Sequence, residues 1–374
     1  MSTLVINDCK TGLVRTEGLL QKTGKRNPAS ASRSLLPLKK PRPILGVMNE
    51  PLLDKFGRTI EYVRLSVTDR CDLRCFYCMP QGFRDFEAPD HWLTFDEIIR
   101  VMAAFADLGV KRVRLTGGEP LVRKGLPELT SRLSALPGID DLSLSSNAVQ
   151  LARDAGALRQ GGVSRLNISL DSLRPERFKE ITGGRLDKVL TGLQAAKQAG
   201  FDPIKINMVV MRGINDDEVE AVTDFCLVHG FTLRFIETMP MGETGQEASE
   251  MFLDLREVRD RLEKRFDLLP GVMAGGGPAR YVQVAGTDLR IGFITPISQH
   301  FCDTCNRVRL SVDGTLYTCL GQDHSYPLRK HLRAGASHEE IKAHILEAIA
   351  LKPERHEFNE KPNQVIRFMS MTGG

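Results

Sequence analysis

The feature that most constrains the fold is an alternation of strand-like and helix-like segments that repeats six times between residues 63 and 237. Such alternation requires parallel strands joined by right-handed crossovers. Six units are two short of a closed eightfold barrel, so the sequence predicts an α/β fold, a partial (βα)6 TIM-like barrel open at one side. The predicted strands cover 63–67, 110–116, 141–146, 165–170, 204–210 and 233–237, and the helical stretches between them include 94–108, 126–136, 187–199 and 216–229.

Side-chain alternation along four of these strands predicts what the barrel encloses. Successive residues of a strand point to opposite faces, and here one face is apolar and the other polar. The apolar faces must meet the helices, so the polar faces line the interior. Arg114 and Lys205 then point inward, which predicts a polar and partly anionic ligand. The polar faces are Arg114, Thr116 and Gly118; Ser143, Ser145 and Asn147; Asn167, Ser169 and Asp171; and Lys205 and Asn207.

Local signals set the helix ends and the domain limits. Thr94 and Glu97 form a capping-box pattern at the start of the first helix, and Gly200 and Gly230 follow helix ends, where a left-handed residue is favoured. After residue 237 the repeat stops, and 239–245 and 271–278 are expected to be loops. We predict a basic extension at 1–52, the barrel at 53–240, and a small α+β cap at 241–374 that lies across the open side. The predicted cap contains helices at 255–266, 328–333 and 337–351, and strands at 280–284, 289–295, 307–312 and 316–318.

Composition excludes several classes of protein. The chain has 374 residues and a net charge of +4, and nine Lys and Arg lie within residues 1–45 against Asp8 and Glu17. The positive charge therefore belongs to the N-terminal extension, and no nucleic-acid-binding surface is indicated on the body. No apolar run approaches the roughly 18 residues of a membrane span. These features predict a cytoplasmic protein with no membrane partner. We favour a bacterial extension for the basic segment, with a transit peptide as the alternative.

Six of the eight cysteines form two triplets, which is typical of metal binding and too few for a disulfide scaffold. Cys71, Cys75 and Cys78 have the spacing C-x3-C-x2-C directly after the first predicted strand. Three thiolates can hold a [4Fe-4S] cluster and leave one iron without a protein ligand. The alternative is structural zinc, which usually takes four ligands.

The second triplet is Cys302, Cys305 and Cys319. Its alternative is a structural zinc completed by His300 or His324. Arg307 and Arg309 follow Cys305 on one face of a predicted strand. They form either a solvated or ion-paired stripe, or a clamp for a phosphate group, since guanidinium geometry suits phosphate oxygens. Of the remaining cysteines, Cys226 lies in an apolar helical stretch and is predicted to be a core residue.

The first triplet, with Tyr77 before its last cysteine and the segment Gly117-Gly118-Glu119-Pro120 after the next strand, resembles the radical S-adenosylmethionine (SAM) superfamily. The second triplet and the terminal Gly373-Gly374 narrow the resemblance to the GTP 3′,8-cyclase (MoaA) family of molybdenum-cofactor biosynthesis. It runs from about residue 53 to residue 374. It implies two [4Fe-4S] clusters, SAM, and GTP as the substrate. It further implies an external low-potential electron donor and transfer of the product to the cyclic pyranopterin monophosphate synthase, and it leaves a homodimer open.

The implied reaction is a radical rearrangement of GTP. A 5′-deoxyadenosyl radical from SAM takes hydrogen from C3′ of GTP, and C3′ then attacks C8 of guanine, which lies at the open iron of the second cluster. The implied SAM contacts are Tyr77, Gly118, Ser169 and Met239. The implied GTP contacts are Arg64, Arg114, Ser145, Lys205, Arg307, Val308 and Arg309. The implied catalytic residues are Arg309, Gly373 and Gly374.

Two alternatives and one departure stay open at this point. Another two-cluster radical SAM enzyme could act on a peptide, and a zinc module could use its basic segment on nucleic acid. Where the family commonly has Thr-Thr-Asn-Gly, this chain reads Ser145-Ser146-Asn147-Ala148. Ala148 in place of Gly predicts a backbone without positive φ at this position.

Overall fold

The predicted core of six parallel strands is present in the computed structural model, which describes residues 51–273 and 275–372. Strands β1 to β6 are hydrogen-bonded neighbours in sequence order. The basic segment before residue 51 and the terminal Gly373 and Gly374 lie outside the described residues. The six strands are β1 (Tyr62–Ser66), β2 (Arg112–Thr116), β3 (Asp141–Ser146), β4 (Arg165–Ser169), β5 (Ile204–Val209) and β6 (Thr232–Ile236).

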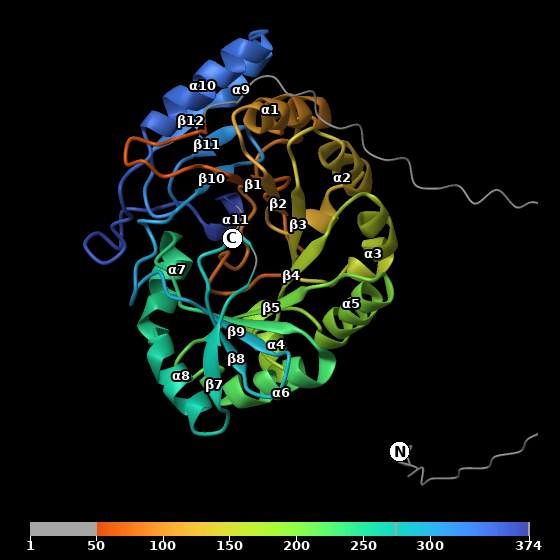
Figure 1. The fold of residues 1–374 in the computed structure, drawn as a ribbon, viewed down its shortest axis with the longest axis vertical. Coiled ribbons are helices and arrows are strands. Elements are labelled where there is room, and N and C mark those ends of the chain that lie inside the picture. The colour runs from red at the N-terminus through yellow and green to blue at the C-terminus, as the bar shows by residue number, and fades with distance from the viewer. Residues whose placement is uncertain (1–50, 274, 373–374) are drawn as a thin grey trace, which may run out of the picture. The chain divides into compact units, whose positions relative to one another are not determined.

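Helices follow the strands and lie in an arc on their outer side (Figure 1). The four predicted helical stretches are confirmed, and α3 and α4 are additional. Helix α1 shows why the sequence predicts its start, because Thr94 and Glu97 make the reciprocal capping-box hydrogen bonds. Its buried face packs Val101 and Phe105 into the core. These helices are α1 (Phe95–Asp107), α2 (Leu126–Ser134), α3 (Leu151–Gln160), α4 (Pro175–Thr182), α5 (Leu186–Gln198) and α6 (Val219–His229).

The C-terminal strands extend this sheet at both of its edges. Strand β9 (Arg290–Ile294) pairs in parallel with β6, and β10 (Arg307–Leu310) pairs in parallel with β1. Eight parallel strands therefore run in the order β10, β1 to β6, β9, so the two strands missing from a (βα)8 barrel come from the C-terminal region. The outer strands are antiparallel additions: β8 (Arg280–Val284) and β7 (Leu268–Gly271) beside β9, and β11 (Thr315–Tyr317) and β12 (Ser325–Pro327) beside β10.

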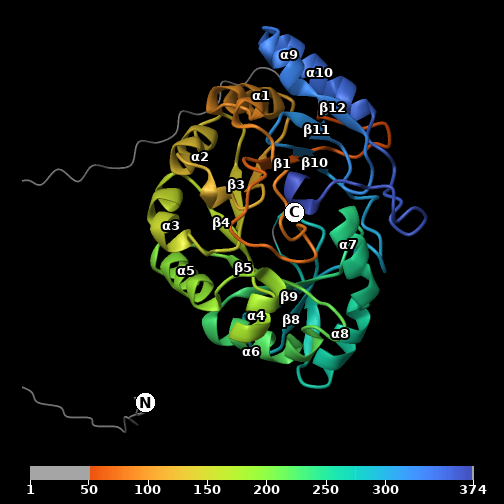
Figure 2. The same ribbon diagram turned by 180° about the vertical axis from the view of Figure 1, so that it is seen from behind.

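The remaining helices are α7 (Gly242–Ala248), α8 (Leu255–Glu263), α9 (Leu328–Arg333), α10 (His338–Ala350) and the short α11 (Met369–Thr372). Two predicted loops are partly wrong, because α7 begins at Gly242 within the expected loop 239–245, and Gly271 ends β7. Both views show α11 inside the ring of strands and helices (Figures 1 and 2). In the part of the chain that the structure describes, no helix is long and apolar enough to cross a membrane.

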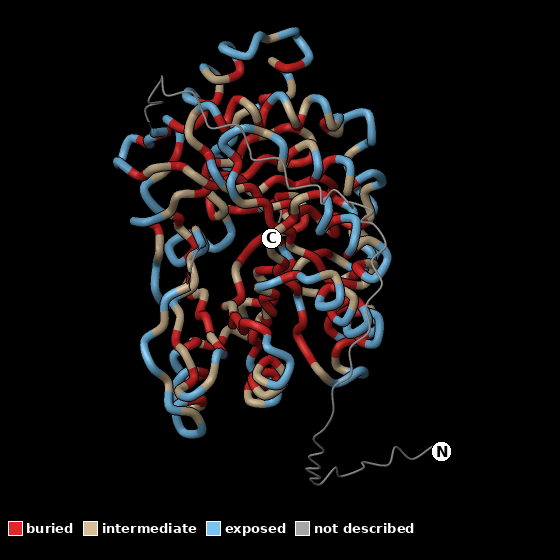
Figure 3. Tube along the Cα trace, turned by 45° about the vertical axis from the view of Figure 1, so that its right-hand side comes forward, coloured by how far each residue is buried: buried red, intermediate tan, exposed pale blue. Residues whose placement is uncertain are grey.

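The core lies between the strands and the outer helices. The predicted apolar faces are buried there, as Leu115, Leu144 and Ile206 are each 0% exposed. Cys226 belongs to the same core, as predicted. Figure 3 shows buried residues gathered in the middle of the molecule and exposed residues at its outer turns. The apolar faces thus point outward to the helices, and the polar faces remain for the interior.

The prediction for Ala148 is wrong. Its φ is +62°, the one positive φ among described non-glycine residues. The conformation is fixed from both sides, since the Oγ of Ser146 accepts the Ala148 N–H at 2.9 Å and helix α5 approaches closely at Gly192. A Cβ on Gly192 would lie 2.2 Å from the Ala148 carbonyl oxygen. Tertiary packing therefore holds a left-handed turn that the residue type disfavours.

Candidate active site

The first cysteine triplet lies in the loop after β1 and lines a central cavity. Main-chain hydrogen bonds from Arg74 to Thr182 and from Phe76 to Ile181 hold this loop against the end of α4. Two N–H groups point at the sulfur of Cys71. The Leu73 main-chain N–H donates to Cys71 Sγ at 3.4 Å, and the Asn147 side-chain amide donates to it at 3.8 Å. Such donors stabilise thiolate ligands, so the site fits an iron–sulfur cluster.

Burial opposes ionisation of these thiols when no metal is bound. Burial, reinforced by Glu119, raises the pKa of Cys71 to about 12, and burial raises the pKa of Cys78 to about 11. The pKa of Cys75 also lies well above its usual value, because the thiol is buried and Asp171 is near. The protein therefore supplies little positive charge to stabilise three thiolates, and bound iron must supply that charge.

Gly117 and Gly118 are required by the close approach of the loop that leads to the first triplet. A Cβ on Gly117 would lie 2.3 Å from the carbonyl oxygen of Thr68, and a Cβ on Gly118 would lie 2.2 Å from that of Arg70. The Gly118 N–H also donates to the Thr68 carbonyl at 2.8 Å. The resemblance implies that Gly118 contacts SAM. The structure gives a more immediate reason, which is main chain packed against main chain.

Glu119 connects this segment to β3. Its buried carboxylate accepts hydrogen bonds from the Ser146 hydroxyl at 2.8 Å and from the Asn147 N–H at 2.7 Å. Asn147 in turn donates to Cys71 Sγ at 3.8 Å. Burial raises the pKa of Glu119 to about 8. The sequence analysis gave Glu119 no role of its own, and its contacts show that it positions residues around the first triplet.

The predicted SAM contacts Tyr77, Gly118, Ser169 and Met239 all line the same cavity. The Tyr77 hydroxyl donates to Asp171 Oδ2 at 2.7 Å, and the other oxygen of Asp171 accepts the Val209 N–H at 2.9 Å. Burial raises the pKa of Asp171 to about 6. The side chain of Tyr77 is thus anchored between the ends of β4 and β5, which fixes its main chain at the edge of the cavity.

The second triplet lines this cavity as well. Cys302 follows β9, Cys305 precedes β10, and Cys319 follows β11. Fold topology therefore brings together six cysteines that are separated by up to 248 positions in the sequence. This juxtaposition is consistent with two metal groups facing one ligand space.

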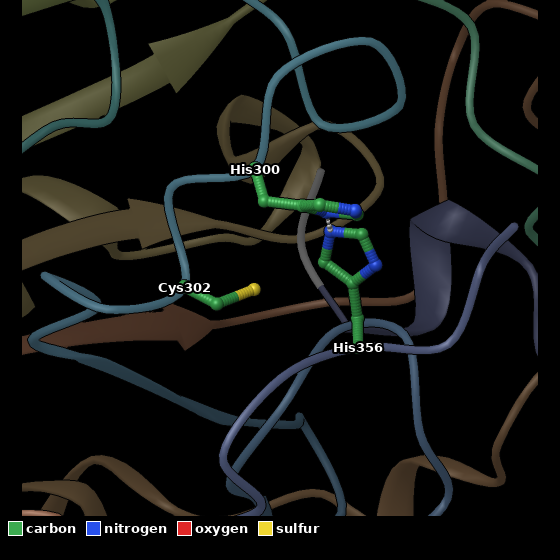
Figure 4. A group of neighbouring side chains, drawn as sticks. All are labelled: His300, Cys302 and His356. Atoms are coloured by element: carbon green, nitrogen blue, oxygen red, sulfur yellow. Dashed lines mark hydrogen bonds between the residues drawn. The ribbon is translucent and has the colours of Figure 1, made fainter.

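Two histidines lie beside Cys302 (Figure 4). His300 Nδ1 and His356 Nε2 are 3.4 Å apart, and one ligand atom from each of His300, Cys302 and His356 lies within 4.8 Å of the others. The zinc alternative named His300 or His324, and among the described residues this group contains His300 but not His324. His356 was not anticipated, because 54 residues separate it from Cys302.

A row of arginines crosses the barrel interior at one level. The register places Arg309 opposite Arg64, and Arg64 opposite Arg114, on three adjacent parallel strands. Burial is the main cause that lowers the pKa of Arg64, and repulsion from Arg309 adds to it. Burial likewise lowers the pKa of Arg309 to about 10, and here repulsion from Arg307 adds to the effect. Three adjacent guanidinium groups that repel one another in a buried cavity favour the binding of an anionic ligand.

Arg234 on β6 adds to this positive interior and was missed by the sequence analysis. It lies opposite Asn207 in the register, is 3% exposed and lines the cavity. The alternation rule predicts it, because Arg234 has the interior parity of its strand. The nearby Lys205 is buried but is not one of the residues that line the cavity. Burial is the main cause that lowers its pKa to about 7, and repulsion from Arg234 adds to it.

The other predicted GTP contacts divide into two groups. Ser145 and Arg307 line the cavity together with Arg64, Arg114 and Arg309. Val308 is 0% exposed in the apolar core, on the face of β10 opposite to Arg307 and Arg309. Its side chain therefore points away from the cavity, and only its main chain remains for a contact.

The C-terminal segment reaches the cavity before it leaves the described residues. Arg367 is ion-paired with Asp323 and donates to the carbonyl oxygen of Cys319 at 3.2 Å. Further along, the Ser370 main chain lies close enough to the Cys78 thiol to oppose the rise in its pKa, and Met369 and Ser370 line the cavity. The segment thus contacts a ligand of each triplet. Gly373 and Gly374 lie outside the described residues, so their implied catalytic role stays a prediction.

Comparison with known proteins agrees with this geometry. Residues 65–226 match the radical SAM superfamily, and residues 231–358 match the Molybdenum Cofactor Synthesis C family. The chain is 51% identical to GTP 3′,8-cyclase 1 of Pseudomonas aeruginosa and 46% identical to the GTP 3′,8-cyclase of Hydrogenovibrio crunogenus, in each case over 86% of this chain and 99% of the relative. The GTP 3′,8-cyclase of Paracoccus denitrificans is 47% identical over 87% of this chain and 96% of its own length.

A solved structure shows the same fold. Streptococcus suis SuiB bound to S-adenosylmethionine aligns with a TM-score of 0.55 at 15% identity, over 83% of this chain and 77% of that chain. Radical SAM proteins carry a [4Fe-4S] cluster and SAM, and the donor set around the first triplet fits them. The sequence relatives and the two matched families decide among the alternatives left open above: this chain belongs to the GTP 3′,8-cyclase family of the radical SAM superfamily.

Proposed function

We propose that this chain holds SAM and GTP together in its central cavity and converts GTP to (8S)-3′,8-cyclo-7,8-dihydroguanosine 5′-triphosphate, in the first step of molybdopterin biosynthesis. The observation that carries the proposal is that six cysteines and five arginines line one cavity. The reaction requires a radical source and a nucleotide at the same place. The cavity offers a cluster site at one side and a cationic wall at the other.

At the first triplet, the chain binds and orients SAM. The cluster, when bound, supplies the electron for reductive cleavage of SAM. Tyr77, Ser169 and Met239 line the cavity beside the triplet and limit where the adenosyl group lies. The enclosed position keeps water away from a reactive radical, which favours hydrogen transfer from C3′ of GTP. Correct placement of C3′ is the main contribution of the protein to the rate.

At the arginine row, the chain binds the triphosphate. Arg64, Arg114 and Arg309 present adjacent guanidinium groups, and Arg307 follows on the same face of β10. Lys205 is not among the residues that line the cavity but lies near Arg234, which does line it, and it is a further phosphate contact in the proposal. Each charge-assisted hydrogen bond to phosphate contributes roughly 1.5–3 kcal/mol. The anion also relieves the mutual repulsion of the buried arginines.

A second [4Fe-4S] cluster at Cys302, Cys305 and Cys319 completes the proposal. Its open iron would hold the guanine and so place C8 beside C3′. The three thiols on the cavity and the absence of a fourth cysteine among the described neighbours support a cluster with an open position. An external low-potential electron donor and transfer of the product to the cyclic pyranopterin monophosphate synthase belong to the same proposal, as does a cytoplasmic location.

The test is anaerobic incubation of reconstituted protein with SAM, dithionite and GTP, followed by identification of the products by mass spectrometry. The cyclised triphosphate, 5′-deoxyadenosine and methionine should form together. Incubations without SAM and with ATP in place of GTP serve as controls. Production of 5′-deoxyadenosine with no cyclised nucleotide, in protein that contains both clusters, would refute the substrate assignment.

A further inference from the structure

Lys352 is buried beside the second cysteine triplet, where the proposed function gives it no role. It follows α10 and is 1% exposed, which is rare for lysine unless the ammonium has partners. Its Nζ lies 3.6 Å from Cys305 Sγ, 3.0 Å from the Arg307 carbonyl oxygen and 2.6 Å from the Thr318 carbonyl oxygen. An ammonium has three N–H donors, so each donor has one acceptor.

The two carbonyls lie at the end of the pairing between β10 and β11. The paired residues of these strands end at Arg309 and Tyr317, and Arg307 and Thr318 lie just beyond. Arg307 comes two positions after Cys305, and Thr318 directly precedes Cys319. The ammonium therefore bridges the two strands where their own hydrogen bonds stop, and it does so between two ligands of the triplet.

A second buried cation ties the third ligand to the same segment. Arg58 donates to the Cys302 carbonyl oxygen at 2.9 Å and to the carbonyl oxygens of Pro353 and Glu354, the two residues after Lys352. Its guanidinium also pairs with Asp54 at 2.6 Å. The Arg58 charge is thus balanced by a carboxylate. The Lys352 ammonium, by contrast, donates to two carbonyl oxygens and to the thiol of Cys305, so its charge is directed at the metal site.

We propose that Lys352 is a positioning residue for the second triplet, and that its ammonium raises the reduction potential of the cluster bound there. The inference rests on the proposed second cluster. Hydrogen bonds to ligand sulfur and nearby positive charge both favour the reduced, more negative cluster. The same contacts position Cys305 and the strand end that precedes Cys319.

The experiment measures the potential of the second cluster alone, in full-length protein that carries Cys75→Ala to remove the first cluster. In this background we compare Lys352→Met, which removes charge and donors, and Lys352→Gln, which keeps donors without charge. Lys342→Met on α10 is the matched control, since that lysine is ion-paired with Glu339 on the same helix. The readouts are iron and sulfide content and an anaerobic redox titration followed by electron paramagnetic resonance.

Both Lys352 variants should lower the midpoint potential, with at least a tenfold fall in the ratio of reduced to oxidised cluster at a fixed potential, which is 59 mV for one electron. Lys342→Met should leave it unchanged. A normal potential in Lys352→Gln would overturn the inference, whether or not Lys352→Met folds. Absence of any cluster in the Cys75→Ala protein itself would instead refute the second cluster, so the two failures are distinguishable.

Discussion

The two cysteine triplets lie on one cavity but in opposite electrostatic surroundings. Near the first triplet the influential charged groups are carboxylates. Glu119 adds to the effect of burial on Cys71, and Asp171 does the same for Cys75, so that both thiols have raised pKa values. The groups that act most strongly on these two thiols include no cation, so this side of the cavity does not favour an anionic ligand.

Near the second triplet the influential groups are cations. Burial would raise the pKa of Cys305, but Lys352 and Arg307 lower it to about 7. Arg309 acts in the same direction from the next interior position of β10. The difference matches the two ligands of the proposed function. SAM carries a sulfonium and an ammonium group, whereas GTP carries a triphosphate, so charge alone favours SAM at the first triplet and GTP at the second.

The largest effects on activity should come from removing one cysteine ligand from either triplet, since the two losses should differ. Cys75→Ala should abolish cleavage of SAM, because three thiolates are the minimum set at the first site. Cys305→Ala should abolish cyclisation and spare some uncoupled cleavage of SAM. Reconstituted protein should contain about eight irons, and each variant about four. Full cyclase activity in Cys305→Ala, or zinc in place of iron at the second triplet, would contradict two clusters.

The C-terminal segment contacts both triplets, so shortening it tests whether the two sides act together. Deleting Gly373 and Gly374 should sharply reduce the cyclised product and leave iron content and 5′-deoxyadenosine formation largely intact. The reason is that Arg367 and Ser370 already place the preceding chain at the cavity. Analysis of the products that the truncated enzyme and the full-length enzyme form with dithionite checks this prediction. Equal rates of cyclisation would show that the last two residues take no part.

Neutralising one member of the arginine row should affect GTP and spare SAM. Arg309→Ala should weaken GTP binding about ten- to a hundredfold, from the loss of one charge-assisted contact worth roughly 1.5–3 kcal/mol. SAM affinity should change little. Arg185→Ala removes an exposed arginine on the outside and serves as control. Calorimetric Kd values for both ligands provide the measurement, and equal losses for both would point to a disordered cavity.

The pH dependence of GTP binding tests whether the cationic side of the cavity binds the triphosphate. Burial lowers the pKa of Lys205 to about 7, so the folded protein favours the neutral amine of this side chain. The contribution of Lys205 to the free energy of unfolding therefore falls as the pH drops from 10.5 toward 7. The triphosphate favours the charged form. GTP binding should therefore take up protons near pH 7 to 8, and affinity should decline severalfold as pH rises through this range. Calorimetry in buffers of different ionisation enthalpy would detect the uptake, and Lys205→Met should reduce it.

The smallest effect concerns the left-handed Ala148 beside the first triplet. Ala148→Gly should relieve a disfavoured φ of +62° but increase the freedom of the unfolded chain. These terms oppose each other, so we expect the free energy of unfolding to change by less than about 1 kcal/mol, toward greater stability. Thermal and denaturant unfolding measure it. A substantial loss of stability would show that the Ala148 methyl group contributes packing of its own.

Much of the fold was accessible from local sequence. The strands β1 to β6 and helices such as α1 agree with the predicted ranges because short apolar runs, helical periodicity and a capping box depend on neighbouring residues. Strand parity also identified the interior side chains along β2 to β5, and seven of those polar residues line the cavity. Local signals failed where packing opposed them, at Ala148 and at the start of α7.

Sequence by itself determined the chemistry available to this protein: two triplets of thiols, a glycine-rich segment and a set of strand arginines, each recognisable within a few positions. Only the tertiary structure decided what these groups do to one another. It placed β10 beside β1, so that Arg309 joined Arg64 and Arg114, and it packed the end of α10 behind the second triplet, so that Lys352 reached Cys305. The physical reason is that spacing along a chain fixes contacts only over a turn or a strand, whereas contacts between distant segments depend on sheet register and burial.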